Sequence, residues 1–137
     1  MRESAPPVAI VTAANVQFHQ WEIGVARKRL EIVRRQFENG TAPQIQVAEA
    51  ERDLAMAEAN GDARKLAIAK VEYAEKRVAL LHELHEAGTS GTDELNAAEN
   101  ALSVARVEKS QAEVKYLERE VARTTAETDR IIHGEGK

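Results

Sequence analysis

The chain contains no cysteine and has few proline, glycine and aromatic residues. Its 137 residues include 3 Pro and 7 Gly, and only 4% are aromatic. The lack of cysteine excludes disulfides and thiolate metal sites. A β-sandwich, a β-barrel or a βαβ fold would need more turn residues and more β-branched runs than this chain has. It has instead 24 Ala and 19 Glu, with 31% charged residues, a composition typical of long helices.

Long apolar runs and a concentration of basic charge are also missing. The longest apolar stretches are short, such as Val8–Val11, whereas a membrane-spanning helix needs about 20 residues. The formal net charge is −4 and basic residues are spread along the chain, unlike the footprint of a nucleic-acid-binding protein. We therefore expect neither a membrane-spanning segment nor a nucleic-acid partner. The first residues lack the apolar region of a signal peptide, so a cytoplasmic location is expected if the chain is complete. A periplasmic or other extracytoplasmic location is expected if it is a fragment of a longer chain.

Three glycines, Gly40, Gly88 and Gly136, stand 48 residues apart. The segments around the first two align over residues 26–59 and 74–107, where 10 of 34 positions are identical. A fixed period of this length is typical of a repeated structural unit. The pattern predicts a 48-residue unit of one helix plus one turn, present nearly three times.

Apolar residues recur every seven positions between the glycines, which is the spacing of a coiled-coil seam. The first segment contains two such lines, Val16, Ile23, Leu30 and Phe37, and Val11, Phe18, Val25 and Ile32. Two lines form an apolar stripe wider than one partner covers, so each helix is expected to contact two neighbours. Alanines such as Ala50 and Ala98 keep one side of the later helices slim and allow close packing.

Turn and capping residues place the helices at about 8–39, 43–87 and 91–133. Gly40 and Gly88 fit the position after a helix, where φ is usually positive. Two capping boxes, Thr41-x-x-Gln44 and Ser90-x-x-Asp93, are expected to start the following helices. Pro6 and Pro7 suit the start of the first helix, and Pro43 the first turn of the second.

These helices predict a single all-α domain over residues 1–137. The expected architecture is a long antiparallel up-down-up three-helix coiled-coil bundle. The register change near Gly61 is interpreted as a local adjustment within the second helix. The two complete turns would then lie at opposite ends of a rod.

The turns resemble the helical hairpins of TolC-type outer-membrane efflux proteins. The matching residues are Phe37-x-x-Gly40 followed by Gln46-Val47, Ala50 and Leu54, and His85-x-x-Gly88 followed by Glu94-Leu95, Ala98 and Leu102. The resemblance implies periplasmic coiled-coil hairpins whose tips dock an adaptor protein. The chain departs from the family in having no strand candidate, so it does not form the family's membrane barrel. It also has Gln46 at an acidic position and His85 at an aromatic one.

His82, His85 and Glu86 are the one cluster with metal-ligand spacing. His82 lies one helical turn from both other residues, and imidazole with carboxylate suits Zn²⁺ or another transition ion. The spacing is not that of the HExxH motif, and a third ligand from elsewhere is needed. His133 is expected at the opposite end of the rod. The alternative is that His85 caps the core at the position equivalent to Phe37 while His82 is solvated.

Two further features of the first helix have both packing and binding interpretations. Trp21, the lone tryptophan, is expected to pack against a neighbouring helix; its alternative role is to anchor a partner. The basic residues Arg27–Arg29, Arg34 and Arg35 are interpreted as a solvated helix face, the alternative being contact with anionic lipid or acidic partners.

Taken together, the residues predict a structural or protein-interaction module, TolC-hairpin-like, that serves as an extracytoplasmic spacer or docking segment. Glutamate pairs two apart, such as Glu49 and Glu51, point to different sides of a helix, so no enzyme and no cofactor are predicted. Protein partners or a second copy would bind through the helix faces and the turns. The predicted contact residues at the turns are Phe37, Asn39, Gly40, Thr41, Pro43, His85, Gly88, Thr89, Ser90 and Asp93. The alternative function is a metal- or ligand-sensing domain that uses His82, His85 and Glu86.

Overall fold

The computed structural model describes residues 8–134, with side chains from residue 14 onward. Within this range the chain forms four helices and no strand: α1 (Val8–Glu38), α2 (Gln44–Ala59), α3 (Ala63–Glu86) and α4 (Thr92–Ile132). The predicted all-α class is confirmed. None of these helices combines the length and the apolar character needed to cross a membrane. The expected helix start at Pro6 and Pro7 lies outside the described residues.

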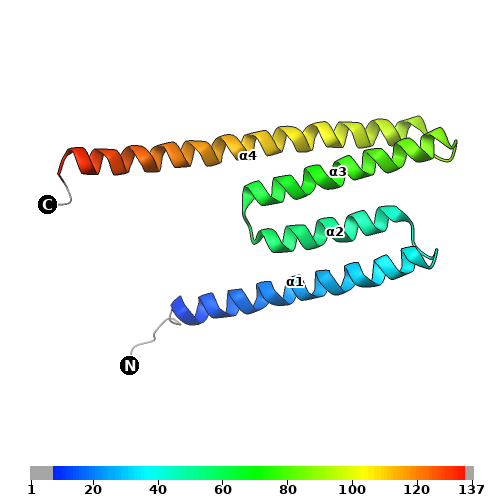
Figure 1. Ribbon diagram of the computed structural model, residues 1–137, viewed down its shortest axis with the longest axis horizontal. Coiled ribbons are helices and arrows are strands. Elements are labelled where there is room, and N and C mark those ends of the chain that lie inside the picture. The colour runs from blue at the N-terminus through cyan, green and yellow to red at the C-terminus, as the bar shows by residue number, and fades with distance from the viewer. Residues whose placement is uncertain (1–7, 135–137) are drawn as a thin grey trace, which may run out of the picture.

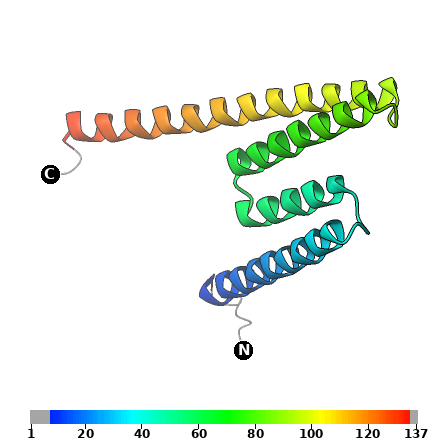
Figure 2. The same cartoon turned by 45° about the vertical axis from the view of Figure 1, so that its right-hand side comes forward.

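The four helices pack antiparallel, each against its neighbours in the sequence. α1 contacts α2, α2 contacts α3, and α3 contacts α4, with no other helix pair in contact among residues 8–134. The helices therefore follow one another in chain order across the molecule (Figures 1 and 2). The result is an open bundle in which α1 and α4 form the two outer edges.

The prediction of a single helix over residues 43–87 is wrong, because the chain reverses at residues 60–62. Asn60 and Gly61 both have positive φ, 50° and 78°. The carboxylate of Asp62 then accepts hydrogen bonds from the backbone N–H groups of Arg64 (2.9 Å) and Lys65 (3.1 Å), which caps the start of α3. What the sequence suggested as a local adjustment near Gly61 is a complete helix–turn–helix reversal, so there are four helices rather than three.

The extra reversal changes where the long turns lie. We call residues 37–43 the first tip and residues 85–93 the second tip. Because α2 and α3 run in opposite directions, both tips lie at the same end of the molecule, on the right in Figure 1, and the turn at Gly61 lies toward the other end. The prediction that the two tips lie at opposite ends of a rod is therefore wrong.

Small residues allow the helices to pack closely. Leu30, Val33 and Ala50 form the apolar cluster between α1 and α2, and Val47 and Leu54 pack against it. A second cluster between α3 and α4 consists of Val71, Ala74, Leu102 and Ala105, with Val78 packed against it. Ala50 and Ala98 each expose only 1% of their surface, as expected for alanines on slim packing faces.

The 48-residue unit is not confirmed as a whole. The turns at Gly40 and Gly88 match each other, but the reversal at residues 60–62 has no counterpart 48 residues later, where residues 108–110 lie inside continuous α4. α4 ends at Ile132, and the glycine that follows it with a positive φ, +72°, is Gly134, which comes 46 residues after Gly88 and not 48. Gly136, the third glycine of the proposed repeat, lies outside the described residues.

Candidate interaction surfaces

The two tips share one backbone geometry. In the first tip, Gly40 donates its N–H to the carbonyl of Phe37 (3.0 Å), and Thr41 donates to the carbonyl of Gln36 (2.8 Å). In the second tip, Gly88 and Thr89 make the same two bonds to His85 (3.0 Å) and Leu84 (2.8 Å). This pair of bonds is the Schellman motif, which satisfies the last carbonyls of a helix and requires a positive φ at the glycine. The expected role of the two glycines is thus confirmed.

The predicted capping boxes are wrong, because neither Thr41 nor Ser90 caps the helix that follows. Thr41 binds back to the preceding helix, and the Ser90 hydroxyl donates to the Glu94 side chain and not to a backbone carbonyl. Thr41 Oγ1 donates to the carbonyl of Gln36 and Thr89 Oγ1 to that of Leu84, each at 3.0 Å. Pro43 and Gly91, the residues that precede α2 and α4, provide no side-chain cap. The threonines close the preceding helix, and Pro43 stands just before α2 instead of in its first turn.

The tips differ in the exposure and the contacts of the ring-bearing residue three positions before the glycine. Phe37 exposes 42% of its surface, whereas His85 is half-buried and its Nδ1 lies 3.2 Å from the carbonyl oxygen of Ser90. The Ser90 hydroxyl in turn donates to Glu94 Oε2 at 3.4 Å. His85 thus ties the second tip together. Of the predicted tip contacts, the exposed ones are Phe37, Asn39, Gly40, Thr41, Pro43, Gly88, Thr89 and Asp93.

The residues predicted to bind a metal have other neighbours. His82 Nε2 lies 3.9 Å from Glu99 Oε1 on α4, His85 contacts Ser90, and Glu86 is exposed. Across the described part of the chain, no three His, Asp or Glu side chains come together as a metal site would need. His133 follows the far end of α4, away from His82, as expected.

Trp21 lies on the surface of α1 and not between helices, so the expected packing against a neighbouring helix is wrong. It exposes 62% of its surface and stacks on Phe18 of the same helix, with ring centroids 5.8 Å apart and planes 28° apart. Val25 and Ile32, which belong to the same heptad line as Phe18, are also exposed. The expectation of two neighbours for α1 is wrong as well, since among the helices of residues 8–134 this helix packs on α2 alone.

The basic residues of α1 divide into two groups. Arg27, Arg29 and Arg34 form ion pairs with α2, to Glu58 (3.7 Å), Asp53 (3.7 Å) and Glu51 (3.2 Å). They therefore join two helices, although the sequence suggested only a solvated face. Lys28 and Arg35 are exposed and have no ion pair among the described residues.

Glu51 connects three helices through its carboxylate. Oε2 contacts Arg34 of α1 at 3.2 Å and Oε1 contacts Lys76 of α3 at 3.0 Å. Burial by itself would raise the pKa of Glu51, but the hydrogen bonds and charges of Lys76 and Arg34 outweigh it and hold the pKa below its ordinary value. This carboxylate links α2 to both of its neighbours.

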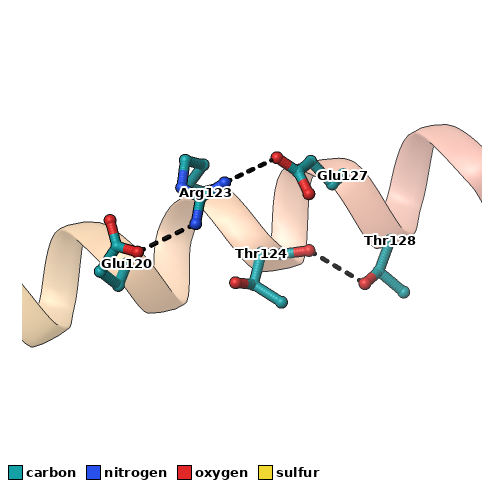
Figure 3. Close-up of polar contacts among 5 residues, drawn as sticks. All are labelled: Glu120, Arg123, Thr124, Glu127 and Thr128. Atoms are coloured by element: carbon teal, nitrogen blue, oxygen red, sulfur yellow. Dashed lines mark hydrogen bonds and ion pairs between the residues drawn. The ribbon is translucent and has the colours of Figure 1, made fainter.

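The second half of α4 extends beyond the rest of the bundle. Arg64 lies over the ring of Tyr116 at 4.1 Å near the start of α3, and from Leu117 to Ile132 every residue except the half-buried Glu120 is exposed. Figure 3 shows how this segment stabilises itself: Arg123 bonds Glu120 and Glu127, each at 2.9 Å, one helical turn away on either side. The hydrogen bond from Arg123 lowers the pKa of Glu120.

Compared with protein-family models, curated proteins and solved structures, the chain matches none of them. The resemblance of the tips to TolC-type hairpins therefore stays a prediction from the sequence.

Proposed function

We propose that this chain is a non-enzymatic structural module that docks a protein partner at the end of the molecule where its two tips lie. The observation that carries the proposal is the pair of matching turns. Gly40 and Gly88 have the same φ to within a degree and close their helices with the same hydrogen bonds, and both tips lie at one end.

Two turns of one backbone shape present the same backbone groups twice, although the side chains differ at Phe37 and His85. A partner that recognises the exposed groups of the first tip finds the equivalent backbone in the second, and binding at two linked sites raises the overall affinity without new kinds of contact. The Schellman bonds hold each tip before binding, so little conformational entropy is lost when the partner docks. The tips therefore suit recognition of a rigid surface.

The length of α4 suits a spacer as well as a docking platform. Its 41 residues span about 60 Å at 1.5 Å per residue. The resemblance to TolC-type hairpins supports the same proposal, since the tips of that family dock an adaptor protein. On this basis we propose an extracytoplasmic location within a longer chain.

Photo-crosslinking in cells that produce the chain tests the docking proposal. A photo-reactive amino acid is placed at Glu38 or at Glu86, one exposed position in each tip, and at Lys65 near the turn at Gly61 as the control. The proposal predicts one crosslinked protein shared by Glu38 and Glu86 and absent from Lys65. Crosslinks of equal strength from Lys65, or different products from the two tips, would contradict it.

A further inference from the structure

The two outer helices of the bundle each expose a line of apolar side chains on the side turned away from their neighbour. α1 packs only on α2, and α4 packs only on α3, so within residues 8–134 no other helix covers these sides. Large exposed apolar patches on a protein mark binding surfaces.

On α1 the line consists of Phe18, Trp21, Val25 and Ile32, which we call the α1 strip. Each exposes between 50% and 62% of its surface. Phe18, Val25 and Ile32 follow one another at seven-residue intervals, like the a positions of a heptad. Trp21 comes three residues after Phe18, where the d position falls. The strip therefore has the pattern of a coiled-coil seam. The seam that packs on α2 is a different one that includes Leu30 and Val33. α1 therefore carries a second seam that no helix of the described part of the chain covers.

On α4 the line consists of Val107, Val114, Leu117 and Val121, which we call the α4 strip. These side chains expose between 55% and 65% of their surface. Three of them are again seven residues apart, and the positions between them include the small residue Ser110. A shallow groove lies on this side of the helix, lined in part by Val107, Ser110 and Val114. The α4 strip is thus slim and nearly flat.

The two strips complement each other in size. The α1 strip contains the bulky rings of Phe18 and Trp21, whereas the α4 strip contains valines and a leucine beside a serine. In a coiled coil each large side chain fits between the residues of the facing helix, so bulky residues opposite slim ones pack well.

The two strips also complement each other in charge. α1 carries five Arg and Lys against three Glu, a net charge of +2, and α4 carries six Arg and Lys against nine Asp and Glu, a net charge of −3. Lys28 and Arg35 stand at seam positions of the α1 strip. The groove of the α4 strip is lined by Glu118 but also by Arg106 and Lys115, so the acidic character belongs to α4 as a whole and not to the groove. Pairing α1 with α1, or α4 with α4, would place like charges together, whereas pairing α1 with α4 places opposite charges together.

Helix direction favours the same pairing. In the chain α1 and α4 run in opposite directions at the two edges of the bundle (Figure 1). A second copy placed beside the first in the same orientation brings its α1 antiparallel to α4 of the first copy. The alternation of directions seen within one copy then continues across the contact.

We propose that the occupant of each strip is a second copy of this chain, with the α1 strip of one copy packed on the α4 strip of the next. Because the two contacting surfaces differ, the contact repeats until it closes into a ring or extends as a chain. The inference concerns the sides of the outer helices and goes beyond the docking of a partner at the tips.

Sedimentation velocity over a range of concentrations tests the association. The proposal predicts that the mass rises from one copy to several as the concentration increases. Trp21 is the lone tryptophan, so its emission reports directly on the strip, and it should shift to shorter wavelength over the same concentrations. A single-copy mass at every concentration would overturn the proposal.

Two variants and their mixture identify which surfaces meet. Val25→Glu damages the α1 strip and Val114→Glu the α4 strip, and both positions are solvent-exposed in one copy, so each variant should fold normally by circular dichroism. Each alone should have the mass of one copy, because each lacks one of the two surfaces. Their equimolar mixture should contain a complex of twice that mass, since each variant retains the strip that the other lacks.

The mixture also separates this proposal from its alternatives. Association of Val114→Glu alone would show that α1 pairs with α1, and association of Val25→Glu alone that α4 pairs with α4; either result overturns the proposal. Leu84→Glu, a change at an exposed leucine outside both strips, is the matched control and should associate as the unmodified chain does. If the tips dock a partner, Val25→Glu chains that carry the photo-reactive amino acid in place of Glu38 or Glu86 should still crosslink to that partner. The crosslink therefore tests the docking proposal separately from the association proposal.

Discussion

Gly40 and Gly88 hold the same left-handed backbone conformation, with φ of +77° and +78°, although they belong to two different hairpins. Space is not the reason for glycine, because an added Cβ would meet no atom within 4 Å at either position. The requirement is conformational: at this φ an L-residue brings its Cβ close to its own carbonyl oxygen.

Replacing either glycine with alanine should therefore destabilise the chain by about 1–2 kcal/mol. Gly24→Ala is the matched control, because Gly24 lies inside α1, has open space around it and should gain up to about 1 kcal/mol from the higher helix propensity of alanine. Urea unfolding of the three variants at low protein concentration measures the difference. Equal effects at Gly24 and Gly40 would show that the tips are not held in the left-handed conformation.

Asp62 is the residue on which the reversal between α2 and α3 depends most directly. Its carboxylate accepts two backbone N–H groups at the start of α3, and these bonds are the largest cause of its lowered pKa. Asp62→Ala should lower the Tm by roughly 3–5 °C, whereas Asp62→Asn should retain most of the cap. Asp93→Ala, in the first turn of α4, is the control, since Asp93 forms no cap. A Tm unchanged in Asp62→Ala would show that the cap does not stabilise the turn.

The tips could be predicted from the sequence because their signals are local. A glycine just after an apolar seam ends a helix in one conformation, and the structure has that conformation at Gly40 and Gly88. The reversal at Asn60 carries an equally local signal, an Asn-Gly pair followed by an Asp that can cap a helix. The sequence alone does not distinguish this reversal from a change of register, because the apolar seam resumes after Gly61 and a glycine is tolerated inside a helix.

The interaction surfaces were harder to predict, because an apolar seam in the sequence does not show which helix packs on it. The line through Phe18, Val25 and Ile32 correctly indicates an apolar face. Whether another helix of the same chain covers it depends on where the chain reverses. With one more reversal than expected, α1 lies at an edge, and Trp21 stays exposed. The same reversal brings the two tips to one end.

Ala50 and Ala98 test the close packing within the two hairpins. Each exposes 1% of its surface, so a larger side chain has no room. Ala50→Leu or Ala98→Leu should destabilise the chain by about 1–3 kcal/mol through overpacking. Ala101→Leu, at an exposed position one turn further along α4, should change the stability by less than about 0.5 kcal/mol. The free energy of unfolding in urea measures all three. Similar losses for Ala98→Leu and Ala101→Leu would show that the α3–α4 contact is loose.

Glu51 should make the stability depend on pH in the acidic range. Its pKa is lowered from the ordinary 4.5 in the folded chain, so the folded state binds its proton less readily than the unfolded state. The stabilisation is therefore complete above the ordinary pKa and is lost as the pH falls through the lower folded value.

Glu51→Gln removes this contribution, which we expect to be about 0.5–1 kcal/mol at neutral pH because the ion pairs to Arg34 and Lys76 are partly exposed and screened. The difference between the two chains should shrink as the pH is lowered below the ordinary value of 4.5. Glu49→Gln makes the same charge change on the same helix at a side chain with no ion pair in the described structure, and should leave the pH profile unchanged. Urea unfolding at a series of pH values measures the free energy of unfolding of each chain. A difference between Glu51→Gln and the unmodified chain that persists at low pH would show that the carboxylate acts through packing and not through its charge.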